Sequence, residues 1–195
     1  MGRKKNNEQE LSDIELISQC SKGKTHAQEI LYRRYFSFAM SVAIRYTCDE
    51  GEAMEIVNDS FMKVLENTGE FDRTRPFRSW YGKILINSAI DNYRRNVKHA
   101  SHLQISEVES TEEQEPEIEA SLSAGDILLL FSHLPEQLRL TFNLFEIEGY
   151  SHNEIGQILG ITASTSRSNL TRAKKILREL YIKNFKTTKV NNEAV

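Results

Sequence analysis

An acidic segment divides the chain into two parts that cannot share one hydrophobic core. Residues 105–122 hold seven glutamates and no lysine or arginine, with Pro116 in the middle. Like charges in such a segment repel one another and keep it extended, so we expect a flexible linker. Periodic apolar residues lie on both sides of it. The sequence therefore predicts two small domains, residues 1–98 and 123–195, joined by an acidic linker at residues 99–122.

Both parts have the apolar spacing of helices. The 195 residues include only three prolines and nine glycines, and hydrophobic side chains recur at intervals of three and four. Ser12 with Glu15, and Thr25 with Gln28, have the spacing of capping boxes, and Gly23 between them is a stop signal. The later helices of the first part are expected at about residues 51–67 and 79–97, on either side of a loop at 69–76. The expected fold class is all-α.

Composition argues against a membrane protein and against a metal site. No run approaches the roughly 20 apolar residues that cross a bilayer, and no apolar segment follows the basic N-terminus. Cys20 and Cys48 lack a C-x-x-C spacing, and His99 with His102 has no further ligand at a suitable distance in sequence. We therefore expect a cytoplasmic protein with no membrane insertion, no metal and no cofactor.

The net charge conceals two basic stretches. The chain totals −3, yet residues 73–98 carry seven basic residues and one acid, and residues 163–189 carry eight and one. Basic stretches of this kind favour a nucleic-acid partner, although the net charge alone would not.

Residues 149–162 have the pattern of a helix-turn-helix. Ser151 and Glu154 form a capping box, Gly160 suits a left-handed turn, and Thr162 caps the next helix. Gly156 allows the second helix to approach closely. That second helix offers hydroxyl and basic side chains suited to base edges and phosphates, namely Thr162, Ser164, Thr165, Arg167, Ser168, Arg172, Lys174 and Lys175. The alternative is a helical hairpin with a solvated basic face.

Residues 77–95 interleave aromatic side chains with cations. Aromatic faces stack on unpaired bases while Arg and Lys follow the backbone, which is typical of proteins that bind single strands. Trp80, Ile84 and Tyr93 are equally consistent with a hydrophobic core.

Residues 13–96 and 124–180 resemble bacterial sigma factors of the extracytoplasmic-function group. Residues 53–61 are similar to the family's helix that docks on RNA polymerase. In the first part the strand-opening motif is matched by Trp80, Ile84, Asn87, Ile90, Asp91, Tyr93, Arg94 and Arg95. In the second part the match includes Leu134, Pro135, Arg139, residues 149–151, Glu154, Ile155, residues 159–161, Thr165, Ser168, Leu170, Arg172, Ala173 and Leu177.

The resemblance implies an initiation factor that binds core RNA polymerase and promoter DNA. Contact with the polymerase would involve Ala53, Glu55, Ile56, Asn58, Asp59 and Phe61. The minus-ten element would be bound by Arg73, Arg75, Arg78, Trp80, Asn87, Arg94 and Arg95, and the minus-35 element by the eight second-helix residues given above. It also implies an anti-sigma partner, a linker running through the polymerase channel, and no small-molecule substrate.

Four residues depart from the family pattern. Met54 stands where the family usually has an acid, and Asn58 where it usually has Gln. Gly156 and Ser166 replace small aliphatic residues at packing positions. Because Ser166 falls on the buried side of its helix, it needs a hydrogen-bond partner.

Parts of the sequence are also consistent with two other functions. Glu52, Glu55 and Asp59 share a helical face that could bind Mg²⁺ in an enzyme, but the second carboxylate pair on a facing helix is missing. The second alternative is a stand-alone helix-turn-helix regulator, which would bind duplex DNA without polymerase. The prediction is a sigma factor, not an enzyme.

Overall fold

The structure, a computed structural model, describes residues 11–99 and 123–186. These residues form helices and turns without a strand, so the all-α prediction is confirmed. The chain divides into two compact units, with the boundary between Tyr93 and Arg94 inside the fourth helix. Of the expected linker, only His99 is described, as the last residue of that helix; residues 100–122 lie outside the described part. The proposed domain limits remain a prediction.

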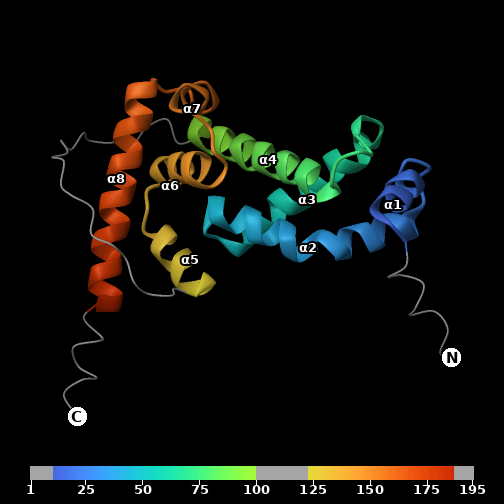
Figure 1. Cartoon of the computed structure of the whole chain (residues 1–195), viewed down its shortest axis with the longest axis horizontal. Coiled ribbons are helices and arrows are strands. Elements are labelled where there is room, and N and C mark those ends of the chain that lie inside the picture. Colours follow the sequence, from blue (N-terminus) through green and yellow to red (C-terminus); the bar gives the residue numbers. More distant parts are fainter. Residues whose placement is uncertain (1–10, 100–122, 187–195) are drawn as a thin grey trace, which may run out of the picture. The chain divides into compact units, whose positions relative to one another are not determined.

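The helices of the first unit are labelled in Figure 1. They are α1 (Asp13–Cys20), α2 (Thr25–Thr47), α3 (Glu50–Glu66), the 3-10 turn η1 (Thr68–Glu70) and α4 (Phe77–His99), which carries the boundary. α2 packs against both α1 and α3. The apolar stripes of these helices form the core, which includes Leu16, Leu31, Ala39, Val57, Val64, Tyr81 and Leu85. Each large apolar side chain buried in this way stabilises the fold by about 1.5–3 kcal/mol.

The first helix start is as predicted and the second is not. Ser12 and Glu15 form a full capping box on α1. Thr25 is already inside α2, whose N-cap is Lys24 without a side-chain hydrogen bond, so the predicted box of Thr25 and Gln28 is wrong. The turn after α1 decides this: Gly23 adopts a φ of 70°, and the Lys24 amide donates to the Gln19 carbonyl, which places extended backbone at Lys24.

An aromatic cluster joins α4 to the other helices of its unit. The rings of Phe77 and Tyr81 stack with centroids 5.6 Å apart, and Tyr35 of α2 meets Phe77 edge-on at 4.6 Å. The Tyr81 hydroxyl lies 3.3 Å from Ser60 Oγ on α3, and burial raises the pKa of Tyr81 to about 12. Tyr35 also donates a hydrogen bond to Asp13 of α1. The N-terminal half of α4 is therefore held by α2 and α3, and Tyr35 links α2 in turn to α1.

The second unit is built around its last long helix. Its elements are α5 (Ala124–Ser132), α6 (Glu136–Phe142), the π-helical turn η2 (Asn143–Ile147), α7 (His152–Leu159), α8 (Ala163–Tyr181) and the π-helical turn η3 (Ile182–Lys186). α8 packs against α5, α6 and α7. The fully buried side chains include Leu140, Leu144, Ile155 and Ala173. α5 begins one residue inside the second predicted domain, after the N-cap Ser123, and Pro135 is the N-cap of α6.

No described helix combines the length and the apolar content that a membrane-spanning segment needs.

Candidate nucleic-acid interface

The predicted helix-turn-helix is formed by α7 and α8. Ser151 caps α7 in a full capping box with Glu154, Gly160 ends that helix at a φ of 70°, and Thr162 caps α8 by accepting from the Thr165 amide at 3.0 Å. All of these local predictions are confirmed. Together they fix where α8 begins and at what angle it leaves α7.

Gly156 sets how closely the turn approaches α7. A Cβ atom at this position would lie 2.7 Å from the Ile161 carbonyl oxygen and 3.5 Å from the Ala163 nitrogen. Both neighbours are backbone atoms, which cannot swing aside as a side chain does. The close approach expected from the sequence is confirmed, and it holds the first residues of α8 against α7.

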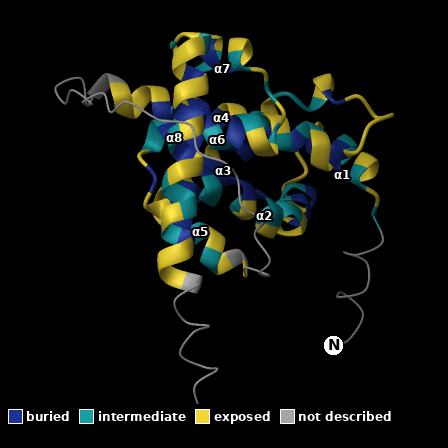
Figure 2. Cartoon of the chain, turned by 60° about the vertical axis from the view of Figure 1, so that its left-hand side comes forward, coloured by how far each residue is buried: buried dark blue, intermediate teal, exposed yellow. Residues whose placement is uncertain are grey.

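The two sides of α8 differ in exposure (Figure 2). Ser166, Asn169, Leu170 and Ala173 are buried along one side. The other side carries most of the predicted minus-35 residues, since Thr162, Ser164, Thr165, Arg167, Ser168, Lys174 and Lys175 are all exposed. A helix with one packed side and one side of hydroxyls and cations matches what a recognition helix places in a major groove.

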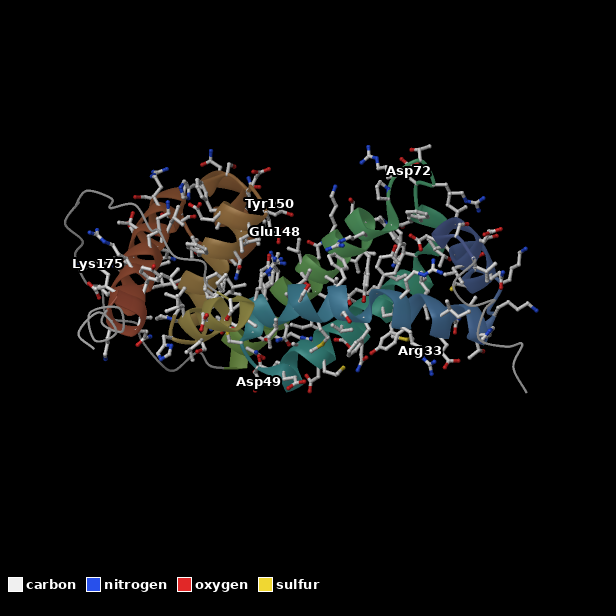
Figure 3. The ribbon with its side chains drawn as sticks, turned by 60° about the horizontal axis from the view of Figure 1, so that its bottom comes forward. Arg33, Asp49, Asp72, Glu148, Tyr150 and Lys175 are labelled. Atoms are coloured by element: carbon white, nitrogen blue, oxygen red, sulfur yellow. The ribbon has the colours of Figure 1, made fainter. Side chains whose placement is uncertain are left out.

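Two predicted residues of α8 are partly engaged within the protein. Arg172 is half-buried, and its Nε atom has almost no exposed surface. Lys174 forms an ion pair with Glu146 of η2, with Nζ and Oε1 3.0 Å apart. Lys175 instead points outward from the helix (Figure 3). Of these three residues, Lys175 is the best placed for a phosphate contact.

In the first unit, Trp80 lies beside the loop that precedes α4. It is half-buried, and its ring lies 5.3 Å from that of Phe71 and 5.8 Å from that of Phe77. Phe71 and Phe77 are buried at the two ends of the loop. Trp80 is therefore held by packing against two rings and remains partly exposed.

The loop between Phe71 and Phe77 is ordered by one carboxylate that sequence reasoning missed. Asp72 accepts from the Thr74 amide at 3.0 Å and the Thr74 hydroxyl at 2.7 Å, and it pairs with Arg75 at 3.3 Å (Figure 3). The hydrogen bonds from Thr74 lower the pKa of Asp72. The Asp-x-Thr spacing is typical of an Asx-turn, in which the aspartate side chain accepts a hydrogen bond from the backbone two residues on. This spacing could have predicted the order of the loop.

The remaining predicted minus-ten residues lie along this loop and one side of α4. Arg73 is exposed, and Arg78 is exposed with its guanidinium 4.3 Å above the ring of Phe38. Further along α4, the helical spacing places three exposed residues on the side that bears Trp80, namely Asn87, Arg94 and Arg95.

The structure separates the predicted polymerase-binding residues into two groups. Glu55, Asn58 and Asp59 are exposed on α3, and Asn58 accepts a hydrogen bond from the Tyr32 hydroxyl at 2.9 Å. Their companions Ala53, Ile56 and Phe61 are 0%, 2% and 7% exposed. These three residues hold α3 in the core of their own unit, and their contact with the polymerase stays a prediction.

Within residues 11–99 and 123–186, no group of His, Cys, Asp and Glu side chains could hold a metal ion. Glu52, Glu55 and Asp59 are exposed on α3 and form no such group. His102 and the side chain of His99 lie outside what the structure describes.

The capping box of α7 makes the stability of the second unit depend on pH. The Ser151 hydroxyl and amide donate to the Glu154 carboxylate at 2.7 and 2.8 Å and lower the pKa of Glu154 below its usual value of 4.5. The carboxylate therefore stabilises the folded state above about pH 4.5, and this contribution is lost as pH falls through the lower folded pKa. We expect Glu154→Gln to flatten the fall in unfolding temperature between about pH 5 and 3.

Circular dichroism of the full chain across this pH range measures the effect. Glu179→Gln, which removes the same charge from an exposed position of α8 outside any cap, is the matched control. Equal pH slopes for the two variants would contradict the prediction.

Comparison with known proteins places both units in one family. The family model "Sigma-70 region 2" matches residues 31–99, and "Sigma-70, region 4" matches residues 124–177. Together the two matches cover more than half of the chain.

Curated relatives match along nearly their whole length. The RNA polymerase sigma-H factor of Pseudomonas aeruginosa is 25% identical over 181 residues, covering 85% of this chain and 91% of the relative. The ECF RNA polymerase sigma-E factor of Salmonella typhimurium is 28% identical over 183 residues, covering 87% and 94%. The ECF RNA polymerase sigma-E factor of Escherichia coli is 27% identical over 183 residues, covering 87% of this chain and 94% of the relative.

Two solved structures are also similar. CnrH in complex with the cytosolic domain of CnrY is 21% identical with a TM-score of 0.46, covering 88% of this chain and 98% of that one. The sigma factor RpoE of Bartonella quintana, in complex with the anti-sigma factor NepR, is 24% identical with a TM-score of 0.46, covering 80% and 96%. The family matches and the sequence relatives carry the conclusion: the chain belongs to the sigma-70 family and is a sigma factor of its extracytoplasmic-function group.

Proposed function

We propose that the chain binds core RNA polymerase and brings it to promoters through two separate DNA contacts. The observation that carries this proposal is the arrangement of α8. One side is packed in the core, while the other presents exposed hydroxyls and cations directly after a capped turn. This arrangement suits recognition of the minus-35 element as an intact duplex.

The minus-ten element would be bound as a separated strand. Unstacking a base costs a few kcal/mol, which contacts with the protein must offset. Phe71 and Phe77 hold the ring of Trp80 in place before DNA binds. An unpaired base can therefore stack on this ring without a further entropic cost of ordering it. The exposed side chains of Arg73, Asn87 and Arg94 would follow the strand's backbone.

The polymerase would be bound by the exposed side of α3. Glu55 and Asp59 give this side negative charge, and Met62 adds an apolar surface that is 56% exposed. We include Asn58 in this contact, where its bond to Tyr32 fixes the side-chain amide.

Four further parts of the proposal follow from the family. We propose that the chain performs no bond chemistry, that it acts in the cytoplasm with the polymerase, and that an anti-sigma factor regulates it. Its acidic linker would run through the polymerase channel.

In vitro transcription tests this function. Purified core polymerase is incubated with genomic DNA fragments, with and without the chain, and RNA start sites are mapped. We expect start sites that appear only when the chain is present and that share sequence at two upstream elements.

A second measurement separates the sigma factor from a stand-alone regulator. The chain without polymerase is titrated with duplexes from the mapped promoters at physiological salt. Tight, sequence-specific binding without polymerase, combined with no new start sites, would overturn the proposal in favour of the regulator.

A further inference from the structure

A partly buried hydrogen bond joins the two helices of the helix-turn-helix. His152 Nδ1 at the start of α7 lies 2.9 Å from Ser166 Oγ on α8. Ser166 is 0% exposed, so its hydroxyl cannot bind water instead. The partner that Ser166 was expected to need is therefore His152, a residue that the sequence did not single out.

The imidazole of His152 is held in a fixed orientation. The ring of Phe145 in η2 stacks on it with centroids 4.4 Å apart and an interplanar angle of 17°. Stacking on Phe145 keeps the Nδ1 atom of His152 directed at the Ser166 hydroxyl of α8. Three elements, η2, α7 and α8, are thus connected through one side chain.

The hydrogen bond acts on the part of α8 that faces DNA. Ser166 lies between Thr165 and Arg167, which are both exposed predicted minus-35 residues. Burial and the positive charge of Arg167 lower the pKa of His152 and so favour the neutral ring. A neutral ring can either donate to or accept from a hydroxyl at Nδ1, and the Ser166 hydroxyl matches both states.

We propose that His152 is a positioning residue for promoter recognition. Through Ser166 it fixes the rotation of the first turns of α8, and hence the point at which Arg167 meets a base edge. Misplacing a bidentate contact weakens it for the correct base more than for the wrong one, so selectivity falls. This inference rests on the proposed recognition of the minus-35 element.

Two substitutions separate the hydrogen bond from packing. His152→Phe keeps a ring against Phe145 but leaves the Ser166 hydroxyl without its partner. His152→Asn removes the ring but retains a polar atom at the same distance along the side chain as Nδ1. Ser166→Ala removes the same hydrogen bond by deleting its other partner. The effects of Ser166→Ala and His152→Phe on discrimination should therefore not be additive in the double variant.

The experiment uses holoenzyme assembled from core polymerase and the full chain. The probes are duplexes of a promoter that the wild-type holoenzyme transcribes, with each base pair of the upstream element varied in turn. We expect His152→Phe to lower discrimination about tenfold at the base pair that Arg167→Ala also relaxes, while binding to unselected duplexes stays the same. His152→Asn is expected to recover most of this discrimination.

Thermal unfolding distinguishes positioning from a loss of folded protein. All binding is measured well below the unfolding temperature of each variant. If selected and unselected duplexes lose affinity in proportion, the role is structural and the proposal is overturned.

Full selectivity in His152→Phe, or a loss in His152→Asn as large as that in His152→Phe, would also overturn it. A different result defeats the proposed function itself: the wild-type holoenzyme shows no preference at any upstream base pair.

Discussion

Replacing Arg167 with Ala is expected to reduce discrimination at one base pair of the minus-35 element by about 1–3 kcal/mol, while the other positions stay selective. Arg167 is exposed in the first turns of α8, and the neighbouring Ser166 anchors the backbone there through His152. A guanidinium carried by an anchored backbone offers a planar pair of donors, which suits a guanine edge. Holoenzyme binding to single-base-pair promoter variants measures the effect.

Lys175→Ala is the matched control for this prediction. Lys175 is exposed two turns further along α8 and points outward (Figure 3). A phosphate contact carries no sequence information, so its loss should weaken all duplexes alike and reduce the dependence of log K on log salt by about one. Our assignment fails if Arg167→Ala gives this uniform loss and leaves the base preferences unchanged.

Replacing Gly156 with Ala is expected to destabilise the second unit by about 1–3 kcal/mol. The added methyl carbon would lie 2.7 Å from the Ile161 carbonyl oxygen, so either the turn or the start of α8 must move. For a unit of this size the unfolding temperature falls by about 4–8 °C for each kcal/mol. Minus-35 selectivity should fall as well, because the displaced segment leads into α8, which carries the proposed base contacts.

Gly82→Ala provides a control with the opposite expected sign. Gly82 also lies inside a helix, but a Cβ there would meet only Phe38 Cζ at 3.7 Å, an ordinary contact. Alanine is favoured over glycine inside helices by about 0.5–1 kcal/mol, so this variant should be as stable as the wild type or more so.

The two units can be followed separately in these measurements. Trp80 is the single tryptophan, so its fluorescence reports on the first unit, while circular dichroism reports on both. A Gly156→Ala chain that unfolds at the wild-type temperature would contradict the predicted clash.

Most helix caps could be predicted from neighbouring residues, whereas most contacts between helices could not; the close approach at Gly156 is the exception. The box of Ser151 and Glu154 and the turn at Gly160 depend on contacts within a few residues, and both were predicted correctly. Thr25 has the same local signal as Ser12, yet the turn through Gly23 moved the helix start by one residue. A local pattern cannot report the backbone path that leads into it.

Predictions about the site fell short for the same physical reason. Residues 53–61 match a docking helix, but a match by position does not say which side chains face the core, as Ile56 and Phe61 do. The bond between His152 and Ser166 spans fourteen positions and exists only because α7 and α8 cross at one angle. The sequence indicated that Ser166 needs a partner, and the fold identifies it.

The close fit between α7 and α8 constrains how this protein can be re-engineered. Gly156 of α7 leaves space for the Ile161 carbonyl that precedes α8, and His152 of α7 forms a hydrogen bond with Ser166 of α8. The side chains of the two helices are therefore matched to each other. A chimera that takes only α8 from another sigma factor would lose these matched contacts between α7 and α8. Promoter preference should therefore be transplanted with both helices as one cassette.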